Sequence, residues 1–205
     1  DRAKRVVDDL ITYREVKPGW LGIEVEEPSE ELAKFLNPPN GAGVIIRKVW
    51  RNSPAEKAGL KPGLLIISLD HRPISSKWEF DEEMRDITLN DEVIIKYLEQ
   101  GVEKEITLRA KDFPLELAPE LCWYLLGLEL EEGVEGVVIS KVDMRSMAGK
   151  IGLGRGDVIL RLNQSEVRNL VGFYQALIKN RNQSSVIIVI KRRNLYYYIT
   201  LPLRS

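Results

Sequence analysis

The chain contains one stretch of sequence twice. Residues 43–74, GVIIRKVWRNSPAEKAGLKPGLLIISLDHRPI, align without a gap on residues 136–167, GVVISKVDMRSMAGKIGLGRGDVILRLNQSEV. The identical positions, in first-copy numbers, are Gly43, Val44, Ile46, Lys48, Val49, Ser53, Ala55, Lys57, Gly59, Leu60, Gly63, Ile66 and Leu69. The same shift carries Phe80 onto Phe173 and Leu108 onto Leu201. Identity spread over the whole stretch indicates a duplicated domain, so the 205 residues divide into two domains of roughly 90 residues each.

Each copy has a local plan that elementary conformational rules predict. Residues 44–46 form a short β-branched run typical of a buried strand. Ser53 is placed to cap a short helix, and Gly59 is placed to end it in the left-handed conformation. A second apolar strand follows over 64–67, then a polar turn over 70–73 and a further short strand at Ile74. The pattern predicts an α+β fold that is mainly β.

The run Ser53-Pro-Ala-Glu-Lys-Ala-Gly-Leu-Lys-Pro-Gly63, followed by an apolar strand and a polar turn, resembles the PDZ domains of HtrA-type (Deg) serine proteases. The tract before it fits as well, because DRAKRVVDDLI resembles the helix that closes the family's protease domain, and KPGWLGI resembles the loop that opens its first PDZ domain. This resemblance implies two PDZ-like, partly open β-barrels or sandwiches, each with two helices, preceded by a short N-terminal helix. The expected boundaries are 1–18 for the helix and linker, 19–112 for the first domain and 113–205 for the second.

Composition removes several classes of function. A formal net charge of −1 provides no whole-chain attraction to nucleic acid or to an anionic membrane. The basic run 191–193 is better explained as a solvated turn than as a nucleic-acid contact. No stretch reaches the roughly 18 apolar residues of a membrane-spanning helix. The single Cys122 excludes an internal disulfide.

Two tracts leave alternatives open. Residues 1–13 place Val6, Val7, Leu10 and Ile11 on one helical face, which is expected to pack either on a protease domain outside this chain or on the first PDZ domain. The first copy also holds 12 extra residues within 26–40, where a capped amphipathic helix is predicted. In the family such an insert lies near the peptide groove and the protease, which implies a contact with one of them. A solvated surface elaboration is the alternative.

The resemblance implies where a peptide would bind. In PDZ domains an apolar–Gly–apolar loop precedes the strand that pairs with an incoming peptide, and its N–H groups converge on the terminal carboxylate. In the first copy these residues are Trp20, Leu21, Gly22, Ile23 and Val25. In the second copy they are Leu125, Leu126, Gly127, Leu128 and Leu130.

The longer helices predicted over 77–87 and 170–179 would form the opposite wall of each groove. By resemblance to the family, groove-facing positions are the first, fifth and eighth helical residues, whose spacing places them on one face. They are Lys77, Asp81 and Met84 in the first copy, and Leu170, Tyr174 and Leu177 in the second. Two grooves with different peptide preferences are expected. The alternative is that one groove is empty or filled by a neighbouring segment, and the second groove is the better candidate for this.

We find no catalytic or metal-binding constellation in the sequence. Serine proteases need a nucleophile, a base and an orienting acid, and the single histidine, His71, lies in a turn that the second copy fills with Gln164. One histidine and one cysteine do not make a zinc cluster, and no cofactor is expected. Residues 152–157 suggest a phosphate loop, but they align with the helix stop of the first copy. The second copy there has Asp157, as the family does, whereas the first has Leu64.

Two functions are therefore expected from the resemblance. The first is a non-catalytic peptide-binding module of an HtrA-type serine endopeptidase in protein quality control, capturing C-termini or exposed apolar segments of unfolded proteins by β-strand addition. The second is a structural PDZ scaffold that packs domains or subunits in an oligomer. The resemblance also implies a bacterial periplasm or cell-envelope location, the parent's own protease domain as a partner, and a homo-oligomer, a trimer or larger, formed through that domain.

Overall fold

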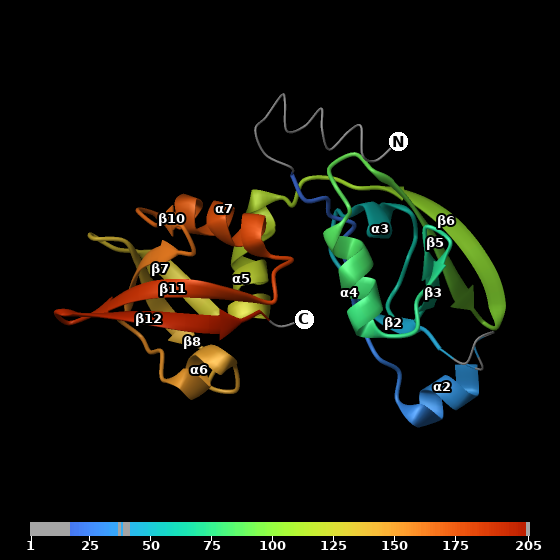
Figure 1. Ribbon diagram of the computed structural model, residues 1–205, viewed down its shortest axis with the longest axis horizontal. Helices are drawn as coiled ribbons and strands as arrows, with labels where there is room; N and C mark the ends of the chain where they lie inside the picture. Colours follow the sequence, from blue (N-terminus) through green and yellow to red (C-terminus); the bar gives the residue numbers. More distant parts are fainter. Residues whose placement is uncertain (1–16, 37, 39–41, 204–205) are drawn as a thin grey trace. The chain divides into compact units, whose positions relative to one another are not determined.

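The computed structural model describes residues 17–36, 38 and 42–203, and these form two compact units that divide between Asp112 and Phe113 (Figure 1). The predicted N-terminal helix over 1–13 lies outside the described residues. Each unit contains one open, antiparallel sheet of six strands and a few short helices. The prediction of a mainly β fold is confirmed.

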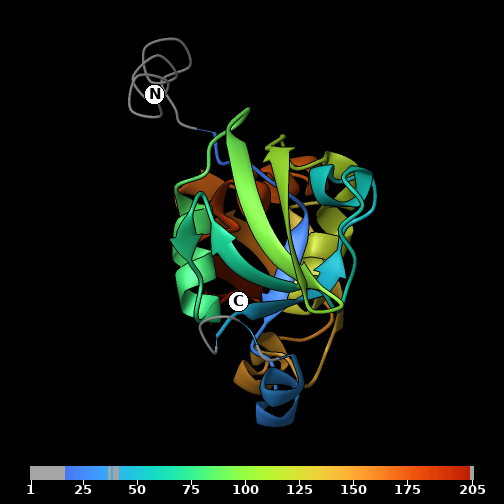
Figure 2. The same ribbon diagram turned by 90° about the vertical axis from the view of Figure 1, so that its right-hand side faces the viewer.

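In unit 1 the sheet order is β1-β2-β3-β5-β6, and β4 pairs with β3. Its strands are β1 Ile23–Glu26, β2 Val44–Val49, β3 Leu65–Leu69, β4 Arg72–Pro73, β5 Glu92–Glu99 and β6 Val102–Arg109. Its helices are α2 Glu30–Leu36, α3 Pro54–Lys57 and α4 Lys77–Arg85. The last two strands form a long twisted hairpin, drawn in green in Figure 2.

In unit 2 the sheet order is β12-β11-β9-β8-β7, and β10 pairs with β9. Its strands are β7 Leu128–Glu132, β8 Val137–Val142, β9 Val158–Leu162, β10 Ser165–Glu166, β11 Ser185–Arg192 and β12 Leu195–Pro202. Its helices are η1 Leu115–Leu117, α5 Ala118–Leu126, α6 Met147–Ile151 and α7 Leu170–Asn180. After β6 the chain enters the 3-10 turn η1 at Leu115, and helix α5 follows at Ala118.

The repeat is preserved in the hydrogen bonds of the two units. Ser53 accepts from the Glu56 N–H and caps α3, as Ser146 caps α6 through the Gly149 N–H. The carbonyl of Gly22 accepts from Trp50 at 2.9 Å, and that of Gly127 accepts from Asp143 at 2.8 Å. Equal bonds at aligned positions show that the local signals of the duplicated stretch dictate the same backbone twice.

Unit 1 buries apolar residues on both faces of its sheet. Val44 and Ile46 of β2 belong to the main core, which also takes Phe80 of α4. Because side chains alternate along a strand, Ile45 points to the other face, where it packs with Leu65, Leu98 and the half-buried Leu36 of α2. The insert of the first copy is therefore anchored on the sheet through Leu36, which explains why β2 begins with three consecutive apolar residues.

Candidate functional site

Each sheet ends in a short strand that leaves one backbone edge unpaired by the described strands. In unit 1 this strand is β1, which pairs only with β2, and in unit 2 it is β7, which pairs only with β8. An unpaired edge presents N–H and C=O groups that a peptide can extend as an added strand. We call β1, the preceding Gly22 loop and α4 site 1, and β7, the Gly127 region and α7 site 2.

In site 1 the segment before β1 is extended and anchored on several sides. The Gly19 N–H donates to the Ile87 carbonyl at 2.8 Å, and Trp20 exchanges two hydrogen bonds with Lys111. The Leu21 carbonyl accepts from the Ala55 N–H in the first turn of α3 at 3.0 Å. These contacts fix the loop from both flanks, so that its remaining polar groups keep a defined direction.

Two successive backbone donors of this loop have no internal acceptor. The N–H groups of Leu21 and Gly22 donate no hydrogen bond to any part of the chain that the structure describes. Gly22 has φ +81°, the left-handed region, and consecutive N–H groups around such a residue form a concave anion site. This arrangement has the chemistry needed to hold a carboxylate.

Close packing explains the glycine in both loops. A Cβ added to Gly22 would lie 2.1 Å from the Cβ of Ser53, and one added to Gly127 would lie 2.5 Å from the Cβ of Ser146. Both serines are the N-cap residues of the following short helix. The loop therefore lies directly against a helix start, and no side chain fits between them.

Site 2 has a different backbone at the same place. Leu125 and Leu126 are the last residues of α5, whose N–H groups bond to carbonyls four residues earlier, as in any α-helix. The Gly127 N–H donates to the Trp123 carbonyl at 2.9 Å and closes the helix with φ +71°. The donors that the sequence predicted for a carboxylate at this loop are thus used within the helix.

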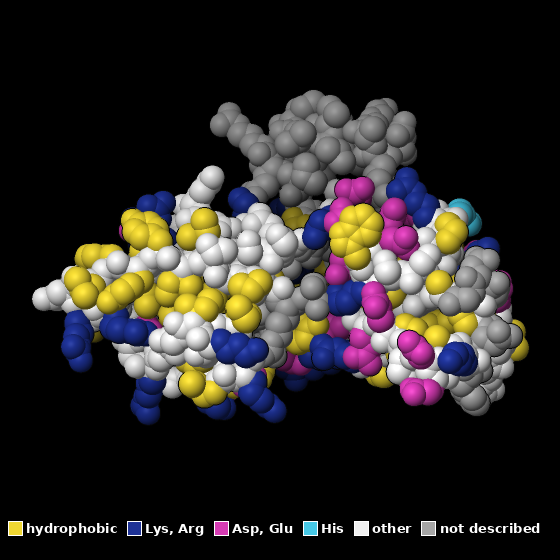
Figure 3. Space-filling model, turned by 60° about the horizontal axis from the view of Figure 1, so that its bottom comes forward, with side chains coloured by type: hydrophobic (Ala, Val, Ile, Leu, Met, Phe, Trp, Pro, Cys, Tyr) yellow, Lys and Arg dark blue, Asp and Glu magenta, His cyan; other side chains and the backbone are white. Residues whose placement is uncertain are grey.

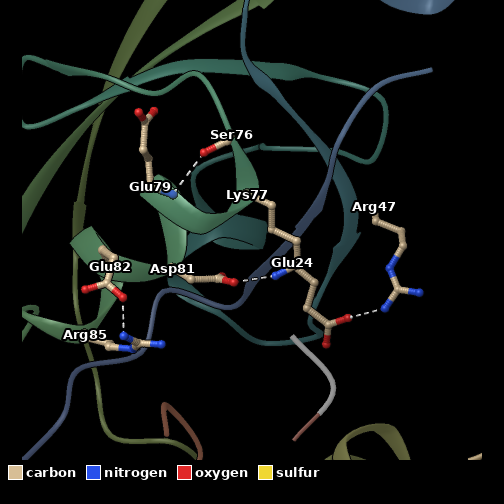
Figure 4. A network of polar contacts seen from close by, with 8 residues as sticks. All are labelled: Glu24, Arg47, Ser76, Lys77, Glu79, Asp81, Glu82 and Arg85. Carbon is tan, nitrogen blue, oxygen red and sulfur yellow. Dashed lines mark hydrogen bonds and ion pairs between the residues drawn. The ribbon is translucent and has the colours of Figure 1, made fainter. Parts of the chain in front are cut away.

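The α4 wall of site 1 carries an ion pair, shown in Figure 4. Lys77 Nζ lies 2.6 Å from Asp81 Oδ2, and both side chains are half-buried. Met84, the third predicted position, packs against the main core of the unit. The same view shows Glu24 of β1 bonded to Arg47 of β2 at 3.1 Å. The two opposite charges of this wall therefore neutralise each other.

The α7 wall of site 2 is apolar and largely covered. Leu177 is fully buried, and Leu170 and Tyr174 are half-buried. The Tyr174 ring meets Phe173 edge-to-face, with ring centroids 5.8 Å apart. Burial, followed by the nearby Cys122 and Glu132, raises the pKa of Tyr174 to about 12.

One contact of site 2 was not predicted from the sequence. The Glu132 Oε1 atom, at the end of β7, accepts from the Leu170 N–H at 3.0 Å and so satisfies an N–H in the first turn of α7. The bond joins residues 38 positions apart in sequence, and no local pattern marks it. The acidic residue at the end of an edge strand is the one signal that could have suggested it.

Most of the predicted site side chains face the core. Trp20, Leu21, Ile23 and Val25 are buried in unit 1. In unit 2, Leu125, Leu126 and Leu128 are buried, and Leu130 is half-buried. Contacts of β1 or β7 with a ligand would therefore be made mainly by the backbone.

The surfaces beside the two sites differ in charge. Helix α4 contains Glu79, Asp81, Glu82 and Glu83, whereas α7 contains no acidic residue. On the face shown in Figure 3, acidic side chains gather on unit 1 and hydrophobic side chains are prominent on unit 2.

Other chemically competent residues stand apart from these sites or are inaccessible. His71 is exposed in the turn between β3 and β4. Cys122 is buried in α5, and burial raises the pKa of its thiol far above the usual value. Within the described residues, no three His, Cys, Asp or Glu side chains are grouped to hold a metal ion, and no helix is long and apolar enough to cross a membrane.

Comparison with known proteins gives a consistent result. Residues 19–109 and residues 124–191 each match a PDZ domain family. The chain is 33% identical over 178 residues to the periplasmic serine endoprotease DegP of Salmonella typhimurium, covering 82% of this chain and 36% of that protein. It is 28% identical over 205 residues to a probable periplasmic serine protease do/HhoA-like of Haemophilus influenzae, covering 97% of this chain and 44% of that protein.

These relatives are longer than the chain, which spans less than half the length of each. The matches lie on their PDZ end and do not cover their catalytic domain. Among solved structures, the HtrA-type protease AlgW with decapeptide is 28% identical, with a TM-score of 0.44, covering 55% of this chain and 34% of that one.

Proposed function

Because the chain consists of two PDZ domains in tandem and its homologues are DegP/HtrA serine proteases, we propose that it is a non-catalytic, peptide-capturing module of such a protease. It binds the C-termini or exposed apolar segments of other polypeptides. Unfolded or misfolded substrates expose such segments. The ligand adds as a strand to the free edge of β1, and its terminal carboxylate accepts from the loop N–H groups.

One observation carries this proposal. The N–H groups of Leu21 and Gly22 are directed by a left-handed glycine and have no acceptor among the described residues, next to a strand with a free edge. An unsatisfied donor pair is costly unless water or a ligand completes it. Backbone capture of this kind tolerates many sequences, as a protein that handles unfolded chains requires.

The experiment is a fluorescence titration of the full chain with peptides that have a free C-terminus, using Trp20 beside the loop as the reporter. We expect saturable binding in the micromolar range, about −8 kcal/mol. Gly22→Ala should abolish it, since the added Cβ would meet the Ser53 Cβ at 2.1 Å. Gly59→Ala is the matched control, because Gly59 has φ +86° with nothing within 4 Å of an added Cβ. A folded Gly22→Ala variant that bound peptide normally would refute the proposal.

In the whole protein, capture at this module is relayed to a protease domain outside the described chain. The periplasmic names of the relatives support a location in the bacterial periplasm or cell envelope. The parent protein assembles as a homo-oligomer through that domain. The relay is tested by measuring the protease activity of the full-length protein with and without added C-terminal peptides. We expect the peptides to increase the rate of peptide-bond cleavage.

A second candidate function, a structural scaffold, is favoured by β12. This edge strand has no charged residue, and Leu195, Tyr196 and Tyr198 are each at least 60% exposed. Its counterpart β6 carries Glu103, Lys104 and Glu105 at the positions of the three tyrosines, and charges on an edge oppose strand-to-strand association. Concentration-dependent self-association in sedimentation velocity, lost in Tyr198→Glu and unaccompanied by peptide binding, would favour the scaffold.

A further inference from the structure

We propose that unit 1 has a further binding site, on the face of its sheet opposite the main core, which takes the guanidinium group of an arginine side chain from another polypeptide. The site is a hollow of about 200 Å³ beside the turn between β3 and β4. Binding there is independent of peptide capture at β1. The residues lining the hollow that matter here are Ile67, Ser68, His71, Pro73, Lys96 and Glu103.

A bulge in β3 shapes the hollow. The pairing of β3 with β5 passes from Ile66 opposite Tyr97 directly to Ser68 opposite Lys96, so Ile67 is an extra residue. An extra residue interrupts the alternation of side chains along a strand. Ile67 packs on the small cluster outside the main core, and Ser68 lines the same hollow. Two consecutive side chains therefore lie on one face of the sheet, and the second of them is only a serine.

The hydroxyl of Ser68 is buried without a partner. Ser68 is 8% exposed, and its Oγ atom forms no hydrogen bond with any residue that the structure describes. A buried polar atom of this kind costs free energy unless water or a ligand completes it. The hollow is far larger than the roughly 15 Å³ that a single water needs, so it has room for a ligand group.

The charges around the hollow leave one carboxylate unbalanced. Lys96 Nζ lies 3.6 Å from Glu105 Oε2, so these two charges offset each other. The Glu103 carboxylate forms no hydrogen bond or ion pair within the described part of the chain. With His71 neutral at pH 7, the rim therefore carries a net negative charge and attracts a cation.

A guanidinium suits this hollow better than an ammonium does. It is more weakly hydrated, so it loses less on entering a space lined in part by Ile67 and Pro73. Its planar fork of donors can serve the Glu103 carboxylate and the Ser68 hydroxyl together, whereas an ammonium acts as a compact point charge.

Unit 2 supplies an arginine of its own at the aligned position. The same bulge occurs in β9, where Arg161 takes the place of Ser68. The Arg161 Nη2 atom lies 3.5 Å from the carbonyl oxygen of Gln164, the counterpart of His71. A guanidinium can thus reach this turn from the bulge. In unit 1 the serine leaves that room to an arginine of another chain.

The test is nuclear magnetic resonance of the full chain, in which the single histidine, His71, provides one imidazole signal beside the hollow. The probe is N-acetyl-arginine amide, for which we expect a saturable shift of that signal with a roughly millimolar dissociation constant. N-acetyl-citrulline amide has nearly the same shape without the charge and should bind about tenfold more weakly, because the charge-assisted hydrogen bond is lost. No saturable shift, equal binding of the two probes, or a larger response to acetate would overturn the proposal.

Two substitutions assign the response to the hollow. Glu103→Gln should weaken binding of the arginine probe about tenfold. Its matched control is Glu92→Gln, which removes an equal charge at the start of β5 and should have no effect. Ser68→Arg gives unit 1 the residue of unit 2 and should abolish the response, whereas Ser184→Arg adds the same charge at an exposed position of unit 2 and should not.

The dispersion of the amide signals shows whether each variant is folded. Full affinity for the arginine probe in Glu103→Gln would overturn the proposal even if Ser68→Arg failed to fold. Glu103→Gln should leave the response of Trp20 fluorescence to C-terminal peptides unchanged, so failure of this site and failure of the proposed function are distinguishable. A parallel loss of both responses would show that Glu103 acts on the fold of unit 1, and it would overturn its assignment as a ligand-binding residue.

Discussion

The Asp157 carboxylate holds Arg192 through two hydrogen bonds, 2.6 Å from Oδ1 to Nε and 2.7 Å from Oδ2 to Nη2. Asp157 also accepts from the Gly154 N–H at 2.9 Å, and Arg192 donates to the Gly152 carbonyl at 2.7 Å. The pair therefore joins the turn after α6 to the end of β11. Unit 1 has Leu64 and Glu99 at the aligned positions, so the fold itself does not need this pair.

Asp157→Ala should lower the free energy of unfolding of unit 2 by about 2 kcal/mol, because it removes a bidentate partner and leaves the Gly154 N–H without its acceptor. Urea titration combined with hydrogen exchange of the β9 and β11 amides measures the change. Arg168→Ala, which removes the exposed pair with Glu166, is the control and should have no measurable effect. Equal effects of the two substitutions would show that the Asp157–Arg192 pair stabilises unit 2 no more than an exposed ion pair does.

The Lys77–Asp81 pair should set the preference of site 1 for its ligand. Lys77→Leu/Asp81→Tyr gives α4 the residues of α7 and should shift selectivity several-fold from charged towards apolar ligand side chains, because a polar wall becomes apolar. Competition between two peptides that differ by one Lys or Leu upstream of the same C-terminal residue measures this ratio. An unchanged ratio would mean that α4 does not contact the ligand at these positions.

Cys122 should resist thiol reagents in the folded protein and react only on unfolding, since it is buried and burial raises its pKa. The labelling rate with a thiol reagent, followed across a urea titration, should therefore track the unfolding of unit 2. Rapid labelling in the absence of urea would show that α5 opens readily.

The same group makes stability depend on pH. The unfolded chain loses the Cys122 proton near pH 8.5, about its ordinary pKa, whereas the folded protein keeps it. The unfolded state then binds fewer protons, so the free energy of unfolding falls as the pH rises above that value. Tyr174 adds to the fall from about pH 10, because its folded pKa is raised to about 12. Cys122→Ala should flatten the decline between about pH 8 and 10, measured by urea titration at each pH. An equally steep decline would exclude Cys122 as its source.

Leu36→Ser should detach α2 from the sheet without unfolding unit 1, because Leu36 packs on the small cluster of Ile45, Leu65 and Leu98 outside the main core. Limited proteolysis within α2 should become faster, and protection of the β5 amides should stay unchanged. If both changed together, the insert would be an integral part of the core.

The sequence was sufficient for the repeated part of the fold. The N-cap serines and the left-handed glycines act within a few residues, so strands, short helices and turns of both copies followed from local rules. The sequence also predicted that Lys77 and Asp81 share a helical face, because they are four residues apart, and the structure adds the ion pair between them. The Asp157–Arg192 and Glu132–Leu170 contacts could not be predicted, because each joins residues more than 30 positions apart in the sequence. Helix α5 did not follow from the Gly127 motif, because a left-handed glycine fits both a strand-opening loop and the end of a helix.

The close packing of Gly22 on Ser53 and of Gly127 on Ser146, which leaves no room for a Cβ, has a bearing on how such motifs are used to annotate genomes. Glycine is demanded there by packing against a helix start, so a copy that had lost every partner would still retain it. The glycine therefore indicates the fold, and it does not indicate whether a peptide binds in the groove. The residues that distinguish the two loops lie three and four positions before the glycine. In unit 1 they are Pro18 and Gly19, which disfavour a helix, whereas in unit 2 they are Trp123 and Tyr124 of helix α5.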